Sequence, residues 1–185
     1  MLADEAGNKD GAIAYMEETL AIERKLGNPT GIADSLGNLA GLIAPTGDVA
    51  RAAALDAEAL EIRRDLGDRL SMAHSLDSIA GTASRAGLAE AGARLFGASE
   101  RLREELGAPI PASERVRYET GLARTRSAVG DEAYERAWAA GRALSLDDAV
   151  AEALHIARQI AQSAETPTRP TRYSTGRRSA AVTSQ

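Results

Sequence analysis

The feature that most constrains the fold of this chain is a repeat of about 40 residues. Four glycines follow one another at intervals of 40, 40 and 43 residues: Gly7, Gly47, Gly87 and Gly130. A leucine-glycine pair returns in the same register: Leu26-Gly27, Leu66-Gly67 and Leu106-Gly107. A fixed period of this length is typical of proteins that stack copies of one small structural unit. The chain is therefore expected to form a short array of such units.

Each period divides into two amphipathic runs that end at glycine-marked turns. The segments 21–28 and 61–68 are near copies, and each ends at a glycine suited to a left-handed helix C-cap. Pro109 and Pro111 account for the longer third interval. The expected helices span residues 9–26, 30–44, 48–66, 70–85, 88–106, 113–128, 131–143 and 145–163. Gly7 is expected at a turn that precedes a second helix, which leaves the first helix of the chain unpaired.

Composition supports helices and excludes several classes of site. Alanine is abundant and aromatic residues make up only 3% of the chain, a mixture that favours close-packed helices over strands. No cysteine is present, which excludes disulfides, thiolate metal sites and a cysteine nucleophile. No uncharged apolar run is long enough to span a bilayer and no signal sequence is recognisable, so a cytoplasmic location is expected.

Small residues recur where paired helices should touch. They are Ala40 and Ala80 on the first helix of a pair, and Ala12, Ala52 and Gly92 on the second. Small side chains allow close approach of helix axes, and Leu36, Leu39, Leu76 and Ile79 are expected to fill the space between repeats.

These residues resemble tetratricopeptide repeats from about Gly7 to Val129. The family pattern is matched in one repeat by Leu39-Ala40, Gly47, Ala52 and Ala59-Leu60. In the next repeat the corresponding residues are Ile79-Ala80, Gly87, Gly92 and Ser99. The long period is similar to the C-terminal repeats of bacterial LuxR-type and signalling-ATPase transcriptional regulators, as are residues 93–111 and 137–150. The resemblance implies an all-α, right-handed superhelix of antiparallel helix pairs over residues 1–164. Its units lie near 7–46, 47–86, 87–129 and 130–164, followed by a disordered basic tail over 165–185.

The resemblance also implies that the first helices line a concave groove for a protein or peptide. Carrying the family's groove positions over gives Asp34, His74, Asp77, Ser84, Arg85, Arg117, Thr120, Arg124 and Ser127. The alternative interpretation is that these positions are ordinary solvated faces of surface helices.

Catalytic and cofactor motifs are missing from the sequence. It contains no phosphate loop, dinucleotide fingerprint or nucleophile elbow, and His74 and His155 have no companions at metal-ligand spacing. An enzyme is therefore not expected, and no cofactor or metal is assigned. Four of the 22 basic residues and none of the 27 acidic ones follow Thr166. The rest of the chain is strongly acidic, so direct nucleic-acid binding is not expected.

The sequence therefore predicts a non-catalytic scaffold that binds a protein or peptide, in bacterial signalling or transcription regulation. Two alternatives stay open. One is the truncated sensory region of a LuxR-type or ATPase regulator, and the other is a repeat domain that senses a small molecule in an enclosed pocket. An unpaired first helix would leave Ile13, Met16 and Leu20 partly uncovered, which makes self-association an expectation.

Overall fold

The computed structural model describes residues 2–163 and is all-helical over that range. Its elements are α1 (Leu2–Leu26), α2 (Pro29–Ile43), the 3-10 turn η1 (Ala44–Thr46), α3 (Val49–Leu66), α4 (Arg69–Arg85), α5 (Ala89–Leu106), α6 (Ala112–Val129), α7 (Asp131–Arg142) and α8 (Leu146–Ser163). These bounds confirm the eight expected helices to within about three residues, apart from the start of α1. The predicted tail over 165–185 lies outside the described residues.

Helix ends form where short polar residues and glycines satisfy the terminal backbone groups. The Asp48 and Asp68 carboxylates accept hydrogen bonds from the backbone N–H groups of Arg51 and Ser71, which caps α3 and α4. At the other ends of α3 and α5, Gly67 and Gly107 adopt φ angles of 68° and 62°. Glycine reaches this left-handed region without steric cost, so the C-cap predicted at Gly67 is confirmed, as is the one at Gly27 with a φ angle of 64°.

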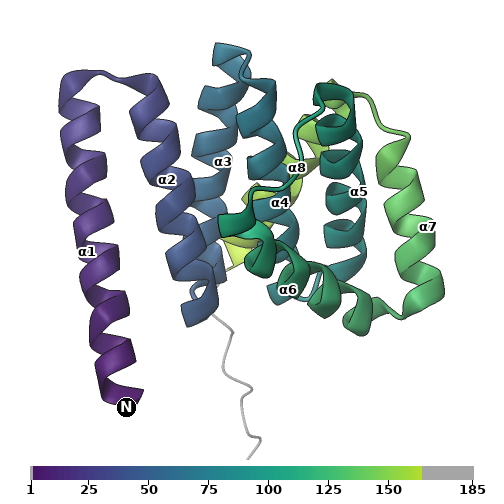
Figure 1. Cartoon of the computed structure of the whole chain (residues 1–185), viewed down its shortest axis with the longest axis horizontal. Helices are drawn as coiled ribbons and strands as arrows, with labels where there is room; N and C mark the ends of the chain where they lie inside the picture. The colour runs from purple at the N-terminus through teal and green to yellow at the C-terminus, as the bar shows by residue number, and fades with distance from the viewer. Residues whose placement is uncertain (1, 164–185) are drawn as a thin grey trace, which may run out of the picture.

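Helices α1 to α5 stand side by side in chain order (Figure 1). The leucines and isoleucine expected between repeats are buried: Leu36, Leu39, Leu76 and Ile79. Ala40, Ala52 and Ala80 are fully buried as well. A Cβ atom added at Gly92 would lie 2.7 Å from the Ala80 carbonyl oxygen, so the α4–α5 contact requires a residue without a side chain there.

The turn expected at Gly7 is not formed. Helix α1 runs without a break from Leu2 through Gly7 to Leu26. A single glycine in a helix costs only about 1 kcal/mol, and its neighbours Ala3, Glu5 and Ala6 favour helix. Leu20 is buried in an apolar cluster that it shares with residues of α2 and α3, and Ile13 and Met16 pack against this cluster. Ile13 and Met16 are only partly buried, as expected, and among the described side chains of α1 the exposed large apolar residues are Tyr15, Ile22 and Leu26.

The second half of the chain departs from simple stacking at α6 and α7. Helix α6 lies across the front of α4 and α5 (Figure 1), and α5 packs more extensively against α7 than against α6. This close α5–α7 contact depends on two glycines. A Cβ atom at Gly97 would overlap the Trp138 carbonyl oxygen, and one at Gly141 would overlap the Arg94 carbonyl oxygen. Only Thr125 of α6 is fully buried, and six of the 18 residues of that helix are charged.

Helix α8 does not extend the stack. The predicted unit over 130–164 would pair α8 with α7, but α8 crosses back behind the stack and packs on α3, α4 and α5 (Figure 1). Its strongly apolar face, which includes Val150, Leu154 and Ile160, joins the core formed by α3, α4 and α5. Burial of that apolar face favours the packing of α8 on the stack. Arg158 of α8 also forms an ion pair with Glu61 on α3. None of the described helices is long and apolar enough to cross a membrane.

Candidate binding site between α4 and α6

Helices α4 and α6 touch at two points and enclose a cavity between them. At one end His74 Nδ1 lies 2.9 Å from Glu114 Oε2. At the other, the hydroxyl oxygens of Ser84 and Thr125 lie 2.6 Å apart. The cavity between these contacts has a volume of about 190 Å³, and the α2–η1 junction closes a third side.

Apolar and aromatic groups line much of this cavity. Phe96 of α5 and Tyr118 of α6 meet edge to face, with ring centroids 5.6 Å apart, an arrangement that aromatic pairs favour. Ala44, Pro45 and Ile110 add further apolar surface. Three glycines in the walls keep the space open: Gly41, Gly81 and Gly121.

Three arginines also line the cavity: Arg85, Arg117 and Arg124. Among the described side chains, no carboxylate lies within 4.0 Å of any of the three guanidinium groups. Burial lowers the pKa of Arg85, and the positive charge of Arg124 lowers it further, so these two cations are close neighbours. Arg117 reaches across to α2, where a Cβ atom at Gly41 would lie 2.6 Å from its Nη1. The three guanidinium groups therefore have no ion-pair partner among the described side chains, although the charge of Arg117 acts on the buried Asp56 carboxyl.

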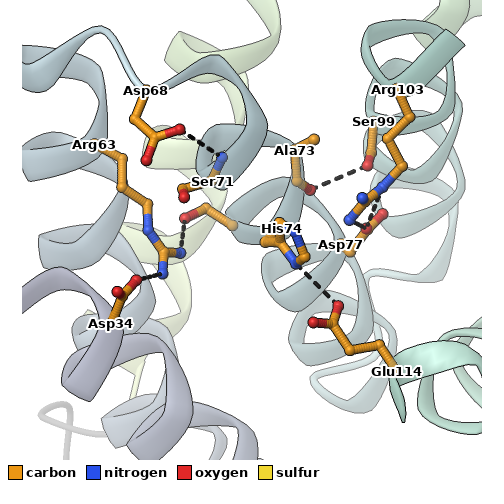
Figure 2. Close-up of polar contacts among 11 residues, drawn as sticks. Asp34, Arg63, Asp68, Ser71, Ala73, His74, Asp77, Ser99, Arg103 and Glu114 are labelled. Carbon is orange, nitrogen blue, oxygen red and sulfur yellow. Dashed lines mark hydrogen bonds and ion pairs between the residues drawn. The ribbon is translucent and has the colours of Figure 1, made fainter. Parts of the chain in front are cut away.

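Each of the two carboxylates that line the cavity, Asp77 and Glu114, has one oxygen in contact with a basic side chain, while Asp77 Oδ1 has no hydrogen-bond partner among the described residues. Arg103 Nη2 donates to Asp77 Oδ2 at 2.8 Å (Figure 2). Burial is the main cause of a rise in the pKa of Asp77 to about 6, which Arg103 opposes. Burial also lowers the pKa of His74, the Arg103 charge adds to this, and Glu114 opposes both. His74 and Glu114 thus hold α4 and α6 together at this end.

A second buried carboxylate lies beneath the cavity wall. Asp56 of α3 is almost fully buried, and it accepts hydrogen bonds from Ser78 at 3.1 Å and Thr82 at 3.4 Å. Burial raises the pKa of Asp56 to about 7 against the opposing effect of these hydroxyls and of the Arg63 and Arg117 charges. Since Ser78 and Thr82 donate their protons inward, the arginines are the cavity's main donors toward a ligand.

A pair of buried arginines repeats with the 40-residue period and ties the first helices together. Arg63 Nη2 donates to Asp34 at 3.0 Å and its Nη1 to Ser75 at 2.8 Å. Arg103 occupies the equivalent place one period later and bonds to Asp77 (Figure 2). These guanidinium groups are buried and hydrogen-bonded, so their role is to hold adjacent helices in register.

The structure brings together six of the nine predicted groove residues at the cavity: His74, Asp77, Arg85, Arg117, Thr120 and Arg124. Asp34 instead pairs with Arg63, Ser84 is buried between α4 and α6, and Ser127 is exposed on α6 outside the cavity lining. Sequence reasoning missed Phe96 and Tyr118. The signal for both was weak, because a lone aromatic on a helix is usually a core residue.

Comparison of the chain with protein-family models, with curated proteins and with solved structures found no match in any of the three. The arguments for function therefore rest on the residues of the cavity and on the packing around it.

Proposed function

We propose that this protein is a non-catalytic binding module that holds an acidic segment of a partner protein on the face formed by α2, α4 and α6. The observation that carries this proposal is the cavity between α4 and α6, with three arginines that lack carboxylate partners among the described side chains. Arginine forks bind carboxylates and phosphates through paired, charge-assisted hydrogen bonds. An acidic partner segment would compensate their charge.

The packing of the other helices supports the choice of face. Helix α8 covers α3, and α7 covers α5, so these two second helices are occupied by the chain itself. The first helices α2 and α4 meet at the cavity instead, together with α6. The resemblance to tetratricopeptide repeats of bacterial regulators supports a role of this module in signalling or transcription regulation, as part of the same proposal.

An array of acidic and neutral peptides tests this function. We expect the full chain to bind a subset of acidic peptides and the Arg117→Glu/Arg124→Glu variant to lose that binding, since like charges then face the ligand. Arg115→Glu is the matched control, because Arg115 is an exposed arginine of α6 outside the cavity lining. Equal binding by the wild type and the double variant would refute the proposal.

Sensing of a small molecule is a second candidate function. It is favoured by the closure of the cavity on three sides, which an open peptide groove does not require. Saturable binding of small organic anions at the same arginines, without binding of any peptide on the array, would select this candidate.

A further inference from the structure

The arginines of the cavity carry more positive charge than one carboxylate can compensate. Arg85 and Arg124 are close enough for the charge of one to lower the pKa of the other, and Arg117 lines the same cavity. A carboxylate brings a single negative charge, whereas a phosphate monoester carries about 1.5 to 2 near neutral pH and three acceptor oxygens. The doubly charged group relieves the repulsion between guanidinium groups better.

The rest of the lining selects an apolar group. Phe96, Tyr118 and Ile110 supply apolar contact, and three glycines leave open space. The cavity of about 190 Å³ exceeds the engineered cavity of about 150 Å³ that holds benzene, so a ring-sized group fits. The hydroxyl of Thr120 donates to the Val116 carbonyl at 2.7 Å, which leaves the guanidinium groups as the principal donors.

The positions of the charges give the ligand a direction. Asp77 and Glu114 line the cavity near its His74 end, where Arg103 and His74 are their partners. Arg85 and Arg124 lie on the segments of α4 and α6 that end at the Ser84–Thr125 contact. An anion is therefore attracted to the Ser84–Thr125 end, and repelled from the carboxylates at the other.

We propose that the cavity between α4 and α6 binds a phosphate monoester with an apolar organic part. The phosphate lies between Arg85 and Arg124 at the Ser84–Thr125 end, and the organic part packs against Phe96 and Tyr118. This inference rests on the proposed function, in which the same face is the binding surface, and it names the chemistry of the ligand. The ester is either a free organophosphate or a phosphorylated aromatic side chain of the partner segment.

Isothermal titration of the full chain with three probes tests the ligand class. We expect phenyl phosphate to bind about 10-fold more tightly than benzoate, which lacks the second charge, and than inorganic phosphate, which lacks the ring. Equal affinity for phenyl phosphate and benzoate, or no binding of phenyl phosphate, would overturn the proposal.

Two variants locate the site. Arg85→Gln/Arg124→Gln should weaken phenyl phosphate binding at least about 10-fold, while Arg115→Gln, on the same helix as Arg124 but outside the lining, should leave it unchanged. Gly81→Leu tests the apolar part independently. A Cβ atom at Gly81 meets nothing within 4 Å and leucine favours helix, so this variant should stay folded, fill the cavity and abolish binding. Unchanged affinity in either cavity variant would contradict the assigned site.

A phosphotyrosine peptide and its unphosphorylated parent separate the two sources and the two proposals. Binding of phenyl phosphate and of the phosphopeptide supports a phosphorylated partner segment, and binding of phenyl phosphate alone supports a free organophosphate. If acidic unphosphorylated peptides bind through Arg117 and Arg124 but phenyl phosphate does not, the proposed function stands and the phosphate inference fails.

Discussion

At the scale of single residues, the most unusual groups are acids inside an alanine-rich core. Asp56 has no cationic partner within ion-pair distance among the described side chains, and its carboxyl is held by two hydroxyl groups. Such a group is easier to bury in its protonated form, which accounts for a pKa of about 7. The stability of a protein with this carboxyl in its core depends on pH near neutrality.

The stability of the protein should therefore contain a contribution from Asp56 that falls as pH rises. The folded pKa of about 7 lies above the ordinary value of 3.8, so the folded state binds the proton more tightly. This contribution is complete below pH 4, is lost between about pH 4 and 7, and stays absent above it.

The Asp56→Asn variant should remove this dependence. Asparagine keeps an acceptor for Ser78 and Thr82 without a charge, so the variant should gain on the order of 2 kcal/mol over wild type at pH 8 and little at pH 4. Urea denaturation at several pH values measures the difference. Asp65→Asn, at an exposed carboxylate, is the control, and parallel curves for wild type and Asp56→Asn would contradict the assignment.

At the scale of elements, α5 is the helix with the most demanding contacts. It meets α4 at Gly92 and α7 at Gly97, and in both places a backbone carbonyl of the neighbouring helix occupies the space of a Cβ atom. Close backbone contact of this kind fixes both the distance and the register of two helices. Helix α7 packs closely on α5, and α6 crosses the front of the stack, where it lines the cavity with α4.

Gly141→Ala should separate α5 from α7. The new methyl group overlaps the Arg94 carbonyl oxygen, and a rigid backbone atom cannot yield as a flexible side chain would, so we expect a loss of about 2–3 kcal/mol in the free energy of unfolding. Gly11→Ala is the matched control. Its Cβ atom meets nothing within 4 Å, so that variant should gain about 0.5–1 kcal/mol from helix propensity alone. A loss of equal size in both variants would exclude the close contact as the cause.

At the scale of the whole molecule, α8 joins parts of the chain that are distant in sequence. In a simple repeat array each unit contacts only its neighbours, and units are able to unfold separately. Here α8 packs on α3, α4 and α5, and its alanines Ala153 and Ala157 are fully buried. The described part of the chain should therefore unfold in one cooperative transition.

The Ala157→Glu variant tests whether the packing of α8 makes unfolding cooperative. A carboxylate at this position has no partner in the α3–α4–α8 core, so we expect a loss of about 3 kcal/mol or more, with the transition broadened because α8 detaches. Ala151→Glu, on the exposed side of the same helix, should change the free energy of unfolding by less than about 0.5 kcal/mol. Circular dichroism during urea denaturation measures both, and a cooperative, unshifted transition in Ala157→Glu would show that α8 contributes little.

The sequence by itself determined the helices and their ends. The 40-residue period, the aspartate caps and the glycines with left-handed φ are local signals, because each depends on hydrogen bonds within a few residues. The buried leucines and small alanines of α2 to α5 also follow from periodicity, since a helix face repeats every three to four residues. Six of the nine predicted groove residues line the cavity because they recur on the same faces of their helices.

Only the tertiary structure decided where the later helices go and which side chains share the site. The return of α8 to α3 depends on the total apolar surface that this arrangement buries, which no local pattern specifies. Ser84 and Asp34 do not line the cavity because each contacts a residue on another helix. Ser84 contacts Thr125, and Asp34 contacts Arg63. Gly97 and Gly141 allow α5 and α7 to meet backbone to backbone, in contacts with Trp138 and Arg94 that span 41 and 47 residues, and such contacts are a property of the folded chain alone.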